Sequence, residues 1–269
     1  PPISTLFPYT TLFRSEIQFS GFAYQNFHQI ENHASRLRWR SQGRYHVPMV
    51  LRAPYGGGVR ALEHHSESRE AFWAHIPGLK MVIPSGPRNA RALLVSAIRD
   101  PDPVIFYEAK ALYRAFREEV PEEQETLPLG VSRIAREGED LTLIAYGAML
   151  RPTLEAAERL EQKRGVSAEV IDLLTISPLD DTLFVASAKK TGHVMIVHEA
   201  PMSFGPGAEI VARLVEKAFY HLEVPVGRLT GYDVVIPMFS REKHYIPSVE
   251  RILHRSEEHT SELQSPNTI

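Results

Sequence analysis

The sequence predicts an α/β protein made of two three-layer units, each with a mostly parallel sheet between layers of helices. Short apolar runs alternate with amphipathic stretches along the chain, and one charged segment with two prolines, residues 113–128, interrupts this alternation. Strand–helix alternation is typical of parallel sheets, because each crossover between parallel strands needs a connection such as a helix. The interruption reads as a linker, so two units are expected rather than one.

Six apolar runs are the expected buried strands. They lack the polar–apolar alternation of half-exposed strands, so both of their faces should be buried. They span residues 47–54, 79–84, 103–108, 141–146, 168–174 and 193–199. A further strand is expected at 16–19, and its sheet neighbours should come from chain that precedes it.

Three other stretches are the expected helices. Apolar residues recur at helical spacing in 27–37 and 154–160, and 88–100 also has a helical pattern. Pro152 suits the first turn of the second of these helices, where a missing N–H group costs no hydrogen bond.

The two ends of the chain differ from its middle. Residues 1–15 follow neither the helical nor the strand period, and residues 255–269 are almost entirely polar. A polar tail buries too little surface to offset its ordering entropy. Both ends resemble translated sequencing adapters, so we expect them to be non-native and the genuine protein to be a fragment within 16–254.

Composition excludes several classes of protein. The net charge is −3, and the 30 Lys and Arg residues are spread along the chain, which argues against a nucleic-acid-binding protein. No apolar run approaches the roughly 18 residues of a membrane span. The chain has no cysteine, which excludes disulfides and thiolate zinc sites and fits a cytoplasmic protein.

Two places carry residues suited to a binding site. The first follows the expected strand 16–19, where Gly21 is flanked by aromatics that include Phe22. An aromatic beyond a strand end can stack on a planar ligand, although residue type alone favours packing in the core. The second is the run Gly56–Gly58 followed by His64 and His65, of which one at most should face a cleft. A structural histidine is the alternative, and no Walker or G-x-G-x-x-G spacing is present.

A third place is the turn between the helix 88–100 and the strand 103–108. Asp100 and Asp102 stand there beside two prolines. Carboxylates and carbonyls in a turn can hold a hard cation. A plain helix stop with turn-forming residues is the alternative.

Taken together, these motifs resemble the β subunit of the thiamine-diphosphate-dependent decarboxylase component of 2-oxo acid dehydrogenase complexes. The pyruvate, branched-chain and acetoin types share this transketolase-like pattern. The similar stretches, in the family's order, are EIQF-GF, GRYHVPMVLRAPYGGG, HHSES, PGLKMVIPS, SAIRDPDPVIF, LTLIAYGAM, AEVIDLLTISPLD and VHEA. The resemblance implies a partial pyrimidine-binding domain at 16–112 and a transketolase C-terminal domain at 129–254.

The resemblance also implies roles for particular residues. Phe22 matches the aromatic that packs on the aminopyrimidine of thiamine diphosphate, and His65 matches the active-site histidine that acts on the 2-oxo acid. Ala97, Asp100 and Asp102 match positions around a structural potassium (K⁺) site. In this family the α subunit binds the diphosphate and its Mg²⁺, which agrees with the lack of a phosphate motif in this chain.

One residue that the family's reaction needs is implied to be missing. That glutamate lies upstream of the strand motif in which Glu16 stands, so we expect the chain to be inactive alone. The complete β subunit is implied to join an α subunit in an α2β2 heterotetramer of a cytoplasmic multienzyme complex. There it would decarboxylate pyruvate or a branched-chain 2-oxo acid and pass the acyl group to a lipoyl acyltransferase core.

Two alternative functions stay open at this point. Another transketolase-type enzyme, transketolase or deoxyxylulose-phosphate synthase, would carry its diphosphate-binding domain upstream on the same chain. A non-enzymatic docking fragment is the other alternative, because the C-terminal domain serves subunit contacts in the family. A neighbouring gene with a thiamine-diphosphate GDG…N motif would favour the separate β subunit.

Overall fold

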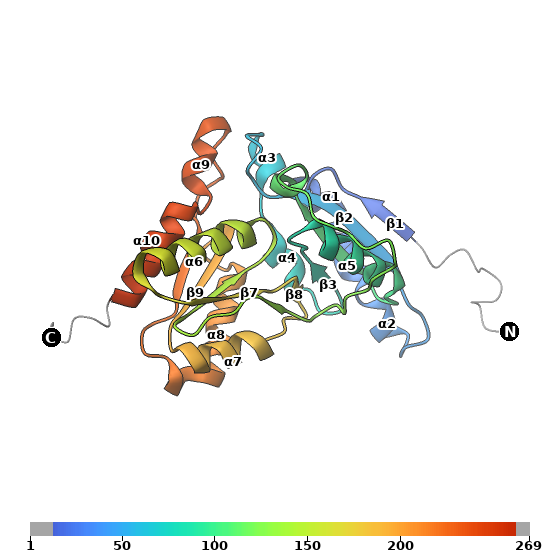
Figure 1. The fold of residues 1–269 in the computed structure, drawn as a ribbon. Coiled ribbons are helices and arrows are strands. Elements are labelled where there is room, and N and C mark those ends of the chain that lie inside the picture. Colours follow the sequence, from blue (N-terminus) through green and yellow to red (C-terminus); the bar gives the residue numbers. More distant parts are fainter. Residues whose placement is uncertain (1–12, 262–269) are drawn as a thin grey trace.

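The structure, a computed structural model, describes residues 13–261 and holds two five-stranded sheets (Figure 1). The first sheet has the order β1-β2-β4-β3-β8 and the second the order β10-β9-β6-β7-β5. The first consists of β1 (Phe13–Glu16), β2 (Met49–Tyr55), β3 (Lys80–Val82), β4 (Val104–Ala109) and β8 (Thr175–Ser177). The second consists of β5 (Arg133–Arg136), β6 (Leu141–Ala145), β7 (Ala168–Asp172), β9 (Val194–Pro201) and β10 (Gly227–Gly231).

Both sheets are mostly parallel, as predicted. In the part of the chain that is described, only the pairs β3–β8 and β5–β7 run antiparallel. Every residue of β6 and β7 is buried, and β9 is buried up to its last residue. The expected burial on both faces is therefore confirmed for the central strands of the second sheet.

Helices cover the sheets in layers. Figure 1 shows α6 and α10 on one side of the second sheet and α7 and α8 on the other, which confirms the three-layer α/β class. The helices are α1 (Tyr24–Gln29), α2 (Leu37–Arg40), α3 (Glu63–Ser66), α4 (Glu70–Ala74), α5 (Pro87–Arg99), α6 (Leu150–Arg164), α7 (Thr182–Thr191), α8 (Pro206–Ala218), α9 (Glu242–Tyr245) and α10 (Val249–Ser261). The expected helix 27–37 is divided, because a π-helical turn, Ile30–Ala34, separates α1 from α2.

The two units share a sheet and a core. β8 belongs by sequence to the second unit but pairs with β3 of the first, and the N–H of Ile83 donates to the carbonyl of Leu174 at 2.8 Å. One continuous cluster of buried apolar side chains runs through both units. Residues 113–132 contain neither helix nor strand and connect the units along α5, where Arg88 pairs with Glu125 at 2.5 Å.

The folded region extends beyond the expected limits 16–254 at both ends. The first strand covers 13–16 instead of 16–19, because its backbone pairs with β2 from Phe13 onward. Helix α10 continues past residue 254 to Ser261, and it buries Ser256 and His259 as a continuation of its inner face. The expectation that all of 255–269 lacks structure is therefore wrong for 255–261. Residues 1–12 and 262–269 of the adapter-like ends lie outside the described residues.

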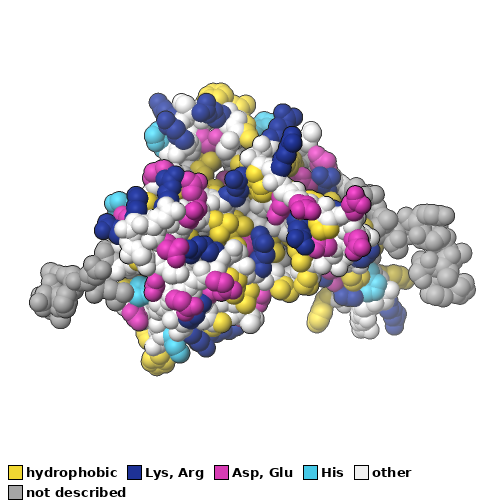
Figure 2. Space-filling view, viewed as in Figure 1, with side chains coloured by type: hydrophobic (Ala, Val, Ile, Leu, Met, Phe, Trp, Pro, Cys, Tyr) yellow, Lys and Arg dark blue, Asp and Glu magenta, His cyan; other side chains and the backbone are white. Residues whose placement is uncertain are grey.

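The visible surface mixes both signs of charge. Figure 2 shows Lys and Arg side chains interspersed with Asp and Glu, and ion pairs such as Arg159–Glu155 and Lys217–Asp181 join them. Among residues 13–261, none of the helices is both long enough and apolar enough to cross a membrane.

Candidate active site

The segment that follows β1 and the segment that carries His64 and His65, both predicted to belong to a site, lie in contact. After β1 the chain turns through a 3-10 helix, Ser20–Phe22 (η2), which packs on α3. A Cβ atom at Gly21 would lie 2.4 Å from the carbonyl oxygen of His64 and 2.5 Å from Oε2 of Glu67. Only glycine leaves room for this approach, and Ser20 Oγ adds a hydrogen bond of 2.9 Å to the carbonyl of Glu67.

This contact places Phe22 and His65 side by side. Their ring centroids lie 5.6 Å apart in an edge arrangement, and the ring of Phe19 lies 4.5 Å from that of His65. Phe22 is 45% exposed, so part of its side chain is open to a ligand. Phe22 and His65 therefore lie at one position beyond the carboxyl end of β1, as a shared binding site requires.

The two adjacent histidines differ in their surroundings. His64 also contacts Phe22, in a stacked arrangement with ring centroids 5.6 Å apart. The short turn α3 lets both rings reach Phe22. The side chain of His64 is exposed and pairs with Glu63, whereas Nδ1 of His65 is buried without a hydrogen-bond partner among the described residues. A buried, unpaired ring nitrogen is the one suited to bind or exchange a proton with a ligand.

Lys110 contacts the backbone of His65 and the ring of Phe19. Its ammonium group donates a hydrogen bond to the carbonyl oxygen of His65 and lies 5.0 Å from the ring centroid of Phe19. Burial lowers the pKa of Lys110, while the charges of Glu242 and Glu199 oppose that shift. Nothing in the sequence around this lysine singles it out, because it stands alone after an apolar strand.

The glycine run is engaged in protein contacts rather than open for a phosphate. The N–H of Gly57 donates to Oε2 of Glu199 at 3.1 Å, and the N–H of Arg60 donates to Oε2 of Glu242 at 2.9 Å. Carboxylates from the second unit thus occupy the positions that phosphate oxygens would take in a phosphate-binding loop. The part of the chain that is described contains no other run of three glycines.

Glu199 belongs to a group of buried acids that sequence reasoning missed. Burial and the neighbouring charge of Glu70 raise its pKa to about 7. Glu70 is fully buried, accepts a hydrogen bond of 2.7 Å from Tyr146, and has a pKa raised by burial. Glu199 stands within the VHEA motif, which was a usable signal, but Glu242 lies in a charged stretch where nothing marks it.

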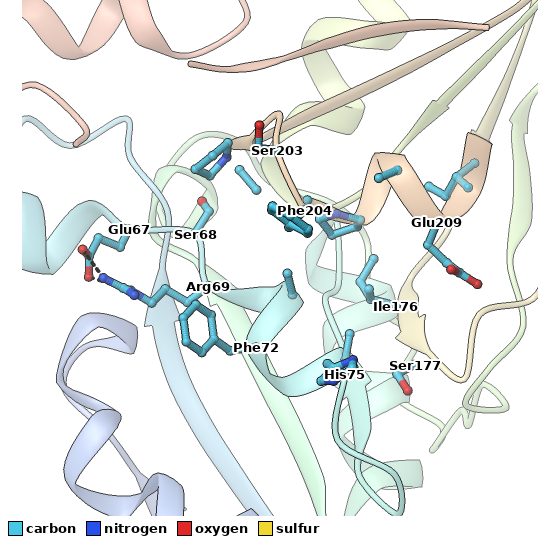
Figure 3. Close-up of a pocket in the computed structure, with 18 of the residues that line it drawn as sticks. Glu67, Ser68, Arg69, Phe72, His75, Ile176, Ser177, Ser203, Phe204 and Glu209 are labelled. Carbon is cyan, nitrogen blue, oxygen red and sulfur yellow. Dashed lines mark hydrogen bonds and ion pairs between the residues drawn. The ribbon is translucent and has the colours of Figure 1, made fainter. Parts of the chain in front are cut away.

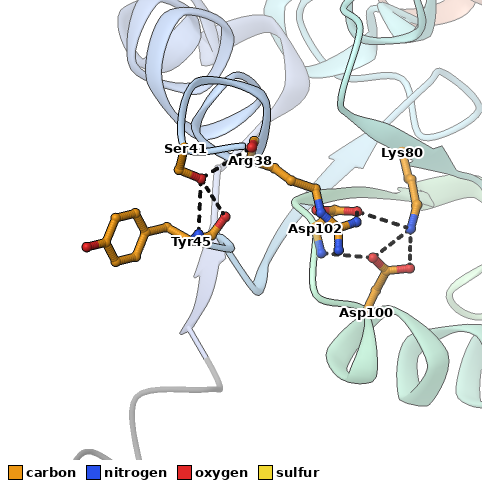
Figure 4. Close-up of polar contacts among 6 residues, drawn as sticks. All are labelled: Arg38, Ser41, Tyr45, Lys80, Asp100 and Asp102. Atoms are coloured by element: carbon orange, nitrogen blue, oxygen red, sulfur yellow. Dashed lines mark hydrogen bonds and ion pairs between the residues drawn. The ribbon is translucent and has the colours of Figure 1, made fainter. Parts of the chain in front are cut away.

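The proposed potassium turn is already neutralised by side chains (Figure 4). Lys80 Nζ binds both carboxylate oxygens of Asp100 at 2.6 and 2.5 Å, and Arg38 binds Asp102 at 2.8 Å. The N–H of Asp102 also donates to Asp100 at 2.9 Å. The two carboxylates therefore do not fit a potassium site as they stand, so an ion near Ala97 would need carbonyl oxygens as its ligands.

A large groove lies next to α3 but is a separate feature (Figure 3). It has a volume of about 1500 Å³ and runs between the two units, with Phe72 on one wall and Phe204 on the other. Its most prominent ion pair, Arg69–Glu67 at 2.5 Å, is satisfied within the chain. Among the described residues, those that line the groove include neither Phe22 nor His65.

Comparison with known families agrees with this geometry. The transketolase pyrimidine-binding domain matches residues 10–115, and the transketolase C-terminal domain matches residues 130–252. A solved structure described as a split gene transketolase, inactive beta4 tetramer, superposes with a TM-score of 0.74. It is 23% identical and covers 93% of this chain and 75% of its own, which shows the fold. The fold and the paired domains define a transketolase-type protein.

Relatives with higher sequence identity identify the family within the transketolase-type proteins. A pyruvate dehydrogenase E1 component subunit beta from Acholeplasma laidlawii is 48% identical over 238 residues, which are 88% of this chain and 72% of the relative. The same subunit is 47% identical in Bacillus subtilis, where the match covers 88% of this chain and 73% of the relative. In Staphylococcus aureus strain Mu50 it is 44% identical over 243 residues, 90% of this chain and 74% of the relative. The chain belongs to the family of E1 β subunits of 2-oxo acid dehydrogenase complexes.

Proposed function

We propose that this chain serves as the β subunit in thiamine-diphosphate-dependent decarboxylation of a 2-oxo acid, with pyruvate as the substrate. Family membership supports the reaction class, and the relatives' names support pyruvate. The observation that carries the proposal is the edge contact between the rings of His65 and of Phe22, which is partly exposed. An α subunit, in an α2β2 assembly, would bind the diphosphate and its Mg²⁺.

The residues present fit the ring end of thiamine diphosphate. Phe22 offers an aromatic face on which a pyrimidine can stack, and that contact would hold and orient the ring. When bound, thiamine diphosphate supplies the electron sink that decarboxylation of a 2-oxo acid requires. The glutamate that family members place upstream has no counterpart among residues 13–261, so this proposal concerns the complete subunit.

His65 would act on the substrate. Its ring stands beside Phe22, and its buried Nδ1 has no competing partner within the described chain. The imidazole can therefore donate a proton to the substrate's carbonyl oxygen and later accept one when the acyl group leaves. The recipient of that acyl group would be the lipoyl arm of an acyltransferase core, as the family resemblance implies.

Replacing His65 tests the proposal. In the complete β subunit assembled with its α partner, His65→Ala should lower turnover of pyruvate with the acyltransferase by about 100-fold or more, the usual contribution of a general acid–base. His33→Ala is the matched control, because His33 is an exposed histidine of the same unit that contacts His28 instead. Equal turnover in the His65→Ala and His33→Ala complexes would refute the role of His65.

Substitution of Phe22 tests the binding of thiamine diphosphate separately from turnover. Phe22→Ala removes the stacking face, so the complex should bind thiamine diphosphate about tenfold more weakly, as the loss of one aromatic contact implies. Calorimetric titration of the complex measures this directly. Phe22→Tyr keeps the ring and should bind like the unchanged protein. An unaltered Kd in Phe22→Ala would show that the cofactor does not stack there.

A further inference from the structure

We propose that Glu199, Glu242 and Lys110 are positioning residues that together hold the segment carrying His65. This segment, residues 56–67, is called the histidine loop here. The importance of the loop for turnover rests on the proposed role of His65. The clamp itself rests on contacts within the described chain.

Glu199 holds the beginning of the loop. Glu199 lies in β9 and is 4% exposed, and its Oε2 accepts the N–H of Gly57 at 3.1 Å. A Cβ atom at Gly56 would lie 2.2 Å from Oε1 of Glu199. Gly56 also has a φ of +77°, which side-chain-bearing residues rarely adopt. The carboxylate therefore lies directly against backbone that only glycine can supply.

Glu242 makes a second contact of the same kind. It is 3% exposed in α9, and its Oε2 accepts the N–H of Arg60 at 2.9 Å. A Cβ atom at Gly57 would lie 2.7 Å from its Oε1. Two carboxylates of the second unit thus bind two amides in the first half of a loop that belongs to the first unit.

Lys110 holds the other half. Its ammonium group donates to the carbonyl oxygen of His65, the residue whose ring meets Phe22. The charges of Glu242 and Glu199 act on Lys110 and favour its charged form. Glu199 and Glu242 therefore accept N–H groups of the histidine loop, and Lys110 donates to one of its C=O groups. The loop is also closed on itself by the N–H of Gly56, which donates to the carbonyl of Glu67 at 3.1 Å.

The loop needs such external support because its only regular element is short. The helix α3 has four residues, and a helix of one turn is not stable by itself. The oxygens Oε1 of Glu199 and Oε1 of Glu242 are buried and find no hydrogen-bond partner in the described chain, which costs stability. An arrangement that costs stability while fixing a site residue is typical of a functional device rather than of core packing.

Hydrogen exchange and turnover test the clamp in the complete β subunit assembled with its α partner. Glu199→Ala, Glu242→Ala and Lys110→Met should each speed amide exchange in residues 56–67 by about tenfold or more, as the loss of one anchoring contact implies. Turnover of pyruvate should fall by about tenfold or more, mostly in kcat, because a loosened loop misplaces His65. Glu199→Gln, Glu242→Gln and Lys110→Arg keep an acceptor or donor and should restore both measurements.

Ser85→Ala is the matched control. It also removes a hydrogen bond between the units, that of Ser85 Oγ to Asp172 at 2.6 Å, but neither residue belongs to the loop. Exchange in 56–67 and turnover should stay as in the unchanged protein.

Three outcomes would test the clamp and separate it from the proposed function. Folded alanine or methionine variants with unchanged loop exchange would overturn the clamp. A Glu199→Gln complex as inactive as Glu199→Ala, with a protected loop, would overturn it too, because Glu199 would then act chemically. If His65→Ala keeps full turnover while the clamp variants loosen the loop, the proposed function fails and the clamp stands.

Discussion

At the scale of single residues, the buried carboxyl group of Glu199 affects both the stability of the protein and the position of the histidine loop. It holds Gly57 through a hydrogen bond, yet burial beside Glu70 raises its pKa to about 7. Near neutral pH the folded protein therefore keeps a mixture of protonated and ionised Glu199. An ionised carboxylate in this place strengthens the hydrogen bond to the loop but lacks the solvation that it would have in the unfolded chain.

This shift predicts a pH dependence of stability. The folded pKa of about 7 exceeds the ordinary value of 4.5, so between these pH values the folded state binds more protons than the unfolded state. The free energy of unfolding should then fall as pH rises through this window, by up to about 3 kcal/mol from this one residue. Glu199→Gln lacks this loss. Its stability relative to the unchanged protein should rise between pH 5 and pH 8 in urea unfolding, and a constant difference would contradict the assignment.

At the scale of elements, the site depends on how closely η2 approaches α3. Gly21 is the contact point, and a methyl group there would collide with the backbone of His64 and the carboxylate of Glu67. The sequence marked Gly21 only as a glycine near aromatics. The collision partner lies more than 40 residues further along the chain, so the reason for the glycine becomes visible only in the fold.

Gly21→Ala should separate the two halves of the site. We expect it to destabilise the protein by about 1–3 kcal/mol and to lower cofactor affinity and turnover, because Phe22 moves away from His65. Gly165→Ala is the comparison variant. Gly165 has no neighbouring atom within 4 Å but has a φ of +69°, so alanine should cost about 1 kcal/mol and leave the site intact. Equal turnover in both variants, measured on assembled complexes, would contradict the expectation for Gly21.

Much of the element pattern could be predicted from the sequence, and the reasons for the misses are physical. Long apolar runs such as 141–146 predicted buried strands correctly, because a strand that is buried on both faces carries apolar side chains at every position. The edge strand β5 was missed because its residues are exposed or half-buried and include two arginines. β8 was missed because three residues carry no period of their own and depend on β3 for pairing.

The site could be predicted only where residue chemistry is local. Phe22 and His65 were identified through the family resemblance, and the structure places their rings in contact. Glu199, Glu242 and Lys110 were missed because each is an ordinary charged residue whose significance depends on distant contacts across the two units. The carboxylate of Asp100 pairs with the ammonium group of Lys80 in β3, a partner that the sequence of the turn does not reveal.

At the scale of the whole molecule, the two units share a sheet and a core, so we expect them to unfold together. β8 of the second unit completes the first sheet, the apolar core is continuous, and the clamp joins both units at the histidine loop. The second unit thus contributes directly to the geometry around His65. A substitution that destabilises one unit should therefore also destabilise the other.

Unfolding measurements can test this coupling. Both tryptophans, Trp39 and the buried Trp73, lie in the first unit, so fluorescence reports on that unit alone. Ile171→Ala, a core substitution in β7 of the second unit, should destabilise the protein by about 2–5 kcal/mol and shift the fluorescence transition together with far-UV circular dichroism. Lys163→Ala, on the exposed side of α6, should shift neither. A fluorescence transition that ignores Ile171→Ala would show that the units unfold independently.

A crystal structure of the complete β subunit with its α partner, thiamine diphosphate and a pyruvate analogue would test the shared site of Phe22 and His65 most directly. We expect the ring of Phe22 to stack on the aminopyrimidine and a ring nitrogen of His65 to lie within hydrogen-bonding distance of an oxygen of the analogue. A cofactor bound away from Phe22, or a His65 ring directed away from the analogue, would refute the proposed site.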